Sequence, residues 1–154
     1  MKHIEFYLDF ISPYAYLAFE ALPQALIGLS YRVTHKPVLF AALLKHHGQL
    51  GPAEIAPKRD WTYRQVAWLA HTNRIDLQLP ASHPFNPLGL LRLAVACAEA
   101  GADEVAVAEL VDVGVAGRDH VGLAVLASQL EGVGAHVGGE VAADLDGAGV
   151  DLAL

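Results

Sequence analysis

The sequence predicts an α/β domain that carries an inserted helical subdomain. The pattern of residues 3–37 predicts a strand, a helix and a second strand, and residues 40–100 hold three helical segments with no strand between them. A connection between parallel strands crosses the sheet in a right-handed sense, which favours an α/β layer over an all-helical bundle. We therefore divide the chain into a βαβ unit at 1–38, a helical insertion at 39–103 and a tail at 104–154.

The first strand is expected at residues 3–10, where aromatic and aliphatic side chains alternate only in part, as in a strand covered on both faces. Ser12 and Pro13 come directly after it. Serine at an N-cap and proline at the first helical position predict a helix that runs to about Leu26. Because the face opposite its apolar repeat is rich in Ala and Leu, we expect this helix to be buried nearly all round.

The second strand is expected at residues 30–37, which alternate with period two and end at Pro37. Three helices are then expected, at residues 40–47, 59–73 and 86–100. Turn-rich loops at residues 49–57 and 79–84 separate them.

The composition changes after residue 100. Every proline and every aromatic residue lies before position 88, whereas residues 101–154 hold ten acidic residues against one basic residue and are rich in Gly, Ala and Val. Residues 105–115 fit a helix or a strand equally, and glycines interrupt the rest of the tail. Because the tail has no aromatic side chain to fill a core, we expect poor order beyond about residue 115.

Charge and hydropathy exclude several classes of function. A net charge of −7 without a basic cluster argues against a nucleic-acid partner, and no apolar run approaches the ~20 residues that cross a membrane. Because Glu5 and Asp9 interrupt any secretory signal, we expect a cytoplasmic location. The only cysteine, Cys97, excludes an internal disulfide, and its Ala and Val neighbours predict a buried, inert thiol.

The strongest local signal for chemistry is Ser12. A residue between a strand's carboxyl end and a helix N-terminus faces unpaired N–H groups and the positive end of the helix dipole, which stabilise an anion such as a thiolate or a phosphate. The simpler alternative is that Ser12 is only a helix cap.

The charged groups elsewhere each allow two interpretations. Lys45 could bind a substrate carboxylate, or it could belong with His46 and His47 to a solvated helix end. Adjacent side chains on a helix diverge by about 100°, so the two histidines predict no metal site. Glu54 and Asp60 could form an acid–base pair, but their spacing favours a structural or solvated role.

The loop of residues 83–87 is constrained by its two prolines. It could hold a polar group in a pocket, whereas capping by Asn86 accounts for that residue without any ligand.

Several motifs resemble the 2-hydroxychromene-2-carboxylate isomerases, which are relatives of kappa-class glutathione transferases and of DsbA. The resemblance covers about residues 3–100, roughly two thirds of the chain. Its motifs are Phe6-Tyr7-Leu8-Asp9-Phe10-Ile11-Ser12-Pro13-Tyr14-Ala15-Tyr16-Leu17-Ala18, Lys36-Pro37-Val38-Leu39-Phe40, Leu44-Lys45, Gly51-Pro52-Ala53-Glu54-Ile55, Lys58-Arg59 and His83-Pro84-Phe85-Asn86-Pro87-Leu88.

The resemblance implies a thioredoxin-like domain with an inserted helical domain and a glutathione cofactor. Ser12 takes the place of the first redox cysteine of DsbA-like proteins, and its hydroxyl would hydrogen-bond the sulfur of glutathione and favour the thiolate. In these isomerases the thiolate is thought to add reversibly to the conjugated substrate, which allows rotation before elimination yields trans-o-hydroxybenzylidenepyruvate. Lys45 matches the substrate-binding lysine, and Asn86 and Glu54 match segments that line the same cleft. The family also implies a homodimer and a role in aromatic compound catabolism.

Two alternatives to this function stay open. One is a related enzyme, either a kappa-type glutathione transferase or a DsbA-family oxidoreductase relative. Ser12 speaks against disulfide exchange, because it replaces the nucleophile. The other alternative is a non-catalytic, truncated remnant.

The tail departs from the family pattern. The Gly-Val-Pro-Thr-Phe-like strand and the Gly-x-Asp-Arg-like turn of the family are both absent, so two C-terminal strands of the sheet are expected to be missing. The amino acids that dominate the tail are Ala, Gly, Val, Asp and Glu, whose codons all begin with G. This bias suggests that the chain leaves the family reading frame near residues 104–117.

We predict that another reading frame of the gene downstream of residue 100 encodes a Val-Pro-Thr-like continuation. Translation of the remaining frames checks this hypothesis. It fails if no frame contains such a segment.

Overall fold

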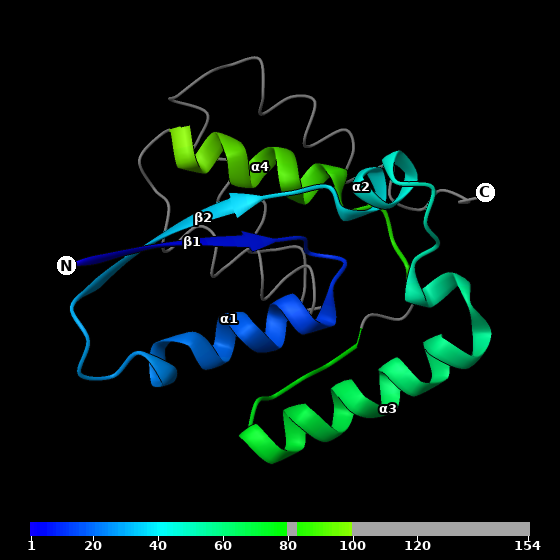
Figure 1. The fold of residues 1–154 in the computed structure, drawn as a ribbon, viewed down its shortest axis with the longest axis horizontal. Helices are drawn as coiled ribbons and strands as arrows, with labels where there is room; N and C mark the ends of the chain where they lie inside the picture. The colour runs from blue at the N-terminus through cyan, green and yellow to red at the C-terminus, as the bar shows by residue number, and fades with distance from the viewer. Residues whose placement is uncertain (80–82, 100–154) are drawn as a thin grey trace.

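The computed structural model describes residues 1–79 and 83–99. Within these ranges the order of elements is β1 (Lys2–Leu8), α1 (Pro13–Ala25), β2 (Tyr31–Pro37), α2 (Phe40–His46), the 3-10 helix η1 (Pro52–Glu54), α3 (Ala56–Asn73) and α4 (Leu88–Glu99) (Figure 1). Every element expected before residue 100 is present, and η1 is an addition inside a predicted loop. The expectations for residues 104–154 lie outside the described residues.

The two strands form the predicted parallel pair. Lys2 lies opposite Tyr31 and Leu8 lies opposite Pro37, and α1 makes the crossover between the strands. In the view of Figure 1, α1 lies below the strands and α4 above them, while α3 extends beyond α1. The carboxyl ends of both strands therefore lead into α1 and α2 at the same end of the strand pair (Figure 1).

Burial of the βαβ unit is less complete than the sequence predicts. Tyr7 on β1 is 60% exposed, and the buried residues of α1 are Pro13, Tyr16 and Leu17. The expectation of a strand covered on both faces and of a helix buried all round is therefore wrong. Alanine is the best helix former and has little apolar area to lose to water, so an Ala-rich face does not report burial.

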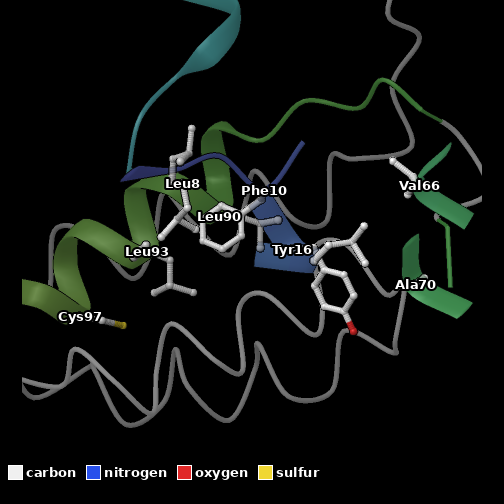
Figure 2. Packing of buried hydrophobic residues seen from close by; sticks show 11 residues of the cluster. Leu8, Phe10, Tyr16, Val66, Ala70, Leu90, Leu93 and Cys97 are labelled. Atoms are coloured by element: carbon white, nitrogen blue, oxygen red, sulfur yellow. The ribbon is translucent and has the colours of Figure 1, made fainter. Parts of the chain in front are cut away.

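One hydrophobic core joins β1, α1, α3 and α4. Figure 2 shows it extending from α4, through the end of β1, to α1 and α3. Its buried members are Leu8, Phe10, Tyr16, Leu17, Val66, Ala70, Leu90, Leu91, Leu93, Ala94 and Cys97. The Cys97 thiol is fully buried, as predicted.

None of the helices within the described ranges has the length and apolarity needed to cross a bilayer.

A buried carboxylate joins the ends of three elements. Asp9 follows β1 and is 3% exposed. Its Oδ2 accepts the N–H of Phe40, the first residue of α2, at 2.7 Å, and its Oδ1 accepts the N–H of Ile11 at 3.2 Å. The backbone carbonyl of Asp9 accepts the N–H of Ser12 at 3.0 Å. The N-cap residue of α2, Leu39, makes no side-chain hydrogen bond to the helix. Asp9, which lies 31 residues before Phe40, therefore satisfies the first N–H of α2 in its place.

Burial raises the pKa of the Asp9 carboxyl above its ordinary value, and the two N–H donors oppose that change only in part. A raised pKa means that the folded protein holds the Asp9 proton more tightly than the unfolded chain does. In the unfolded chain the carboxyl has its ordinary pKa of 3.8. The contribution of Asp9 to the free energy of unfolding is therefore greatest below pH 3.8 and falls as pH rises through the higher pKa of the folded state.

We predict that wild-type protein loses stability relative to Asp9→Asn as pH rises above about 4, because asparagine does not titrate in this range. Urea unfolding of both proteins at a series of pH values from about 3.5 to 7.5 measures the difference. A relative stability that increases with pH would contradict the prediction and would mean that the hydrogen bonds outweigh burial.

Candidate functional site

The site begins at Ser12, where the chain leaves β1 and enters α1. Ser12 is the N-cap predicted from the sequence. Its Oγ accepts the N–H of Ala15 at 3.3 Å and its carbonyl accepts the N–H of Tyr16 at 3.2 Å. Pro13, the first helical residue, has no N–H to satisfy.

Two hydrogen-bond donors are left at this helix end. The N–H of Tyr14 has no acceptor among the residues that the structure describes, and the Ser12 hydroxyl, which accepts from Ala15, still has its own proton to donate. The first turn of α1 carries no acidic side chain. Together with the helix dipole, these donors suit a small anionic group such as a thiolate.

A histidine joins the loop between β1 and α1 to the helical insertion. This loop, residues 9–12, is called the Ser12 loop below. The Nε2 of His83 lies 2.7 Å from the carbonyl oxygen of Ile11, and its Nδ1 lies 2.7 Å from the hydroxyl of Tyr63 on α3. Burial raises the pKa of the Tyr63 hydroxyl, an effect that Arg59 opposes, so Tyr63 keeps its proton at neutral pH. The loop of residues 83–87 thus contributes His83 to the contacts around Ile11.

A second contact from α3 reaches the start of α1. The hydroxyl of Tyr14 donates to the side-chain oxygen of Gln65. Gln65 therefore connects α3 to the first turn of α1, and Tyr63 connects it through His83 to the loop that carries Ser12. By contrast, Trp61 and Trp68 on the same helix are 61% and 62% exposed, so neither tryptophan belongs to the core.

Lys45 is exposed on the last turn of α2. It lies five residues after Phe40, or roughly 8 Å along the helix axis from the residue that Asp9 caps. The rings of His46 and His47 pack edge to face, with centroids 5.0 Å apart. In the two described stretches of chain, no three His, Cys, Asp or Glu side chains are grouped as metal ligands would be.

Glu54 caps its own turn. Its Oε2 accepts the N–H of Gly51 at 2.5 Å. A Cβ at Gly51 would lie 3.1 Å from that oxygen and 3.2 Å from Cδ1 of Leu44 on α2, so only glycine fits without displacing its neighbours. Asp60 forms an exposed ion pair with Arg59, at 3.8 Å. No hydrogen bond joins Glu54 to Asp60 in the described part of the chain, which agrees with separate structural and solvated roles.

Asn86 has the capping role that the sequence allowed. Its Oδ1 accepts the N–H of Leu88, the first residue of α4, at 3.1 Å. The helix predicted from residue 86 therefore starts two residues later. The Asn86 side chain is exposed.

The four predicted site residues belong to segments that converge, but their side chains do not bond to one another. Among the described residues, no hydrogen bond or ion pair joins Ser12, Lys45, Glu54 and Asn86 directly. Asp9 links the Ser12 loop to α2, and His83 links it to the segment that contains Asn86. The contacts of Tyr63 and His83 could not be predicted from the sequence, since no local pattern marks a contact between residues far apart in the chain.

Comparison with known proteins agrees with this architecture. The family profile described as the DSBA-like thioredoxin domain matches residues 3–153. This match continues beyond residue 100, where the sequence resemblance ends, and the reading-frame hypothesis stays a prediction. No curated protein sequence matches the chain significantly.

A solved structure of 2-hydroxychromene-2-carboxylate isomerase has a similar fold. It superposes with a TM-score of 0.63 at 22% sequence identity, over 83% of this chain. This chain spans 65% of that protein's length. At this identity the likeness establishes the thioredoxin-like fold. With the family match, it shows that the chain belongs to the DSBA-like thioredoxin domain family.

Proposed function

We propose that this chain is a glutathione-dependent cis–trans isomerase. Its substrates would be aromatic catabolites like 2-hydroxychromene-2-carboxylate, and its product would be trans-o-hydroxybenzylidenepyruvate. The observation that carries the proposal is the donor pair at the start of α1, which consists of the Ser12 hydroxyl and the N–H of Tyr14. The fold shared with a solved isomerase supports it.

The residues present suit the sulfur of glutathione. A thiolate needs hydrogen-bond donors and a positive potential, and the first turn of α1 offers both without a competing carboxylate. When bound, glutathione would supply the nucleophile that adds reversibly to a conjugated double bond. The role of Ser12 is to hold that sulfur as the anion at the start of α1.

The described residues speak against disulfide exchange. Ser12 stands at the position of a redox nucleophile, and the only thiol of the chain, Cys97, lies fully buried in the core. A buried thiol in apolar surroundings has little thiolate character and no access to a partner disulfide. An isomerase or a transferase therefore suits this site better than an oxidoreductase.

Lys45 is the proposed partner of the substrate carboxylate. Its ammonium group is exposed at the end of α2, where no acidic residue of that helix competes for it. The side-chain oxygens of Glu54 and Asn86 already accept backbone N–H groups, so we assign both residues a role in shaping the segments around the substrate. The homodimer and the cytoplasmic location stay predictions.

We predict that Ser12→Ala raises the Kd for glutathione about tenfold or more, because a hydrogen bond to a charged group contributes about 1.5–3 kcal/mol. Isothermal titration calorimetry measures the affinity. Ser12→Thr, which keeps the hydroxyl, should retain most of it. Ser30→Ala is the matched control, since Ser30 lies beside Lys2 at the opposite end of β1.

Two results would count against the glutathione site. Absence of binding to wild-type protein at millimolar glutathione would favour the non-catalytic alternative. An unchanged Kd in Ser12→Ala would mean that glutathione binds elsewhere. Because Ser12 also caps α1, the variant should lose about 1 kcal/mol of stability, and unfolding curves separate this loss from the loss of binding.

We predict that Lys45→Gln raises KM for the aromatic carboxylate about two- to fivefold and leaves the glutathione Kd unchanged, as expected for an exposed ion pair. Steady-state kinetics at saturating glutathione provide the measurement. Lys2→Gln, an exposed substitution at the far end of β1, should have no effect. Equal kinetics for Lys45→Gln and wild type would remove Lys45 from the site.

A further inference from the structure

We propose that His83 is a positioning residue for Ser12, acting through the peptide unit that joins Ile11 to Ser12. The inference rests on the proposed function, since it assigns His83 to the same glutathione site. His83 was not predicted as a site residue, and it lies 72 positions after Ile11 in the chain.

Both ends of that peptide unit are held. Its carbonyl, on Ile11, lies 2.7 Å from His83 Nε2, and its N–H, on Ser12, donates to the carbonyl of Asp9 at 3.0 Å. A peptide unit is planar, so it turns as one body about its flanking single bonds. Neither end can rotate without breaking a hydrogen bond. The direction in which Ser12 leaves this plane is therefore set by His83 on one side and by Asp9 on the other.

The hydrogen-bond partners decide the tautomer of His83. A carbonyl oxygen can only accept, so Nε2 must carry a proton. In the neutral ring Nδ1 is then bare, and it accepts the proton of the Tyr63 hydroxyl at 2.7 Å. Tyr63 thereby favours the one neutral tautomer that can hold Ile11.

Packing fixes the plane of the His83 ring. The ring of Tyr63 meets it edge to face, with centroids 5.7 Å apart and an interplanar angle of 82°. Phe85 meets it in the same manner at 6.2 Å and 76°. With two aromatic contacts and two hydrogen bonds, the imidazole has little freedom to swing away from Ile11.

This arrangement gives the helical insertion a direct role in the thioredoxin-like site. Tyr63 is on α3 and His83 precedes α4, whereas Ile11 and Ser12 belong to the βαβ unit. Loss of the contact should release the carbonyl of Ile11, loosen the Ser12 peptide and widen the range of directions taken by the Ser12 hydroxyl. Preorganised donors bind an anion more tightly than donors that must be ordered on binding.

The test replaces His83 in two ways. His83→Leu removes the donor, while His83→Gln keeps an N–H donor near the position of Nε2. We expect His83→Leu to weaken glutathione binding about five- to tenfold and His83→Gln to restore most of the affinity. His71→Leu, an exposed substitution on the last turn of α3, is the matched control.

A second readout is independent of glutathione. Amide hydrogen exchange at Ser12, followed by NMR, should accelerate in His83→Leu and stay slow in His83→Gln. The nitrogen chemical shifts of His83 should report a protonated Nε2 and a bare Nδ1 in wild type. Tyr63→Phe should mix the two tautomers and weaken binding by a smaller factor. This variant keeps the imidazole, so it tests the same link if His83→Leu does not fold.

The binding measurements are repeated in the Ser12→Ala background. If His83 acts through Ser12, His83→Leu should cost little further affinity there. An equal loss in both backgrounds, or unchanged Ser12 exchange in folded His83→Leu, would overturn the proposal. If wild-type protein binds no glutathione, the proposed function fails, while the exchange and tautomer measurements still decide whether His83 holds the Ser12 peptide.

Discussion

The hydrogen bonds of the Asp9 carboxylate join the loop after β1 to the start of α2, and the proposed chemistry depends on that loop. The side chain is nearly fully buried, and its two oxygens accept one N–H from the Ser12 loop and one from the start of α2. Burial of a carboxyl group is costly unless its oxygens are bonded, and here each of them is. These bonds restrain the loop after β1, which places Ser12 at the start of α1.

A second set of contacts brings the helical insertion to the same loop. His83 holds the carbonyl of Ile11 and is itself held by Tyr63, while Tyr14 bonds Gln65 on the same helix as Tyr63. The Asp9 side chain, from the βαβ unit, thus bonds the N–H of Ile11, and His83, from the helical insertion, bonds the carbonyl of Ile11. A site whose donors are fixed before the ligand arrives loses less entropy on binding, which is the physical advantage of this construction.

The fold alone does not decide the chemistry. Thioredoxin-like domains that carry a cysteine at the strand-to-helix turn suit disulfide exchange, and a serine at the same place offers only a hydrogen bond. In this chain the hydroxyl of Ser12 and the N–H of Tyr14 are the donors that we propose to bind an anion, and no thiol lies beside them in the sequence. Thiolate chemistry at this position would need a thiol from outside the protein, which is why glutathione is the cofactor we propose.

The sequence by itself determined the βαβ unit, the Ser12 cap, the helices of the insertion and the burial of Cys97, because each is set by a local pattern of polarity, propensity or capping. The resemblance placed Glu54 in a segment that lines the substrate cleft, and the structure adds that its side chain bonds the N–H of Gly51. Only the tertiary structure decided the contacts of Asp9 and His83. Their partners lie 31 and 72 residues away, and contacts at such separations depend on how whole elements pack, which no local pattern encodes.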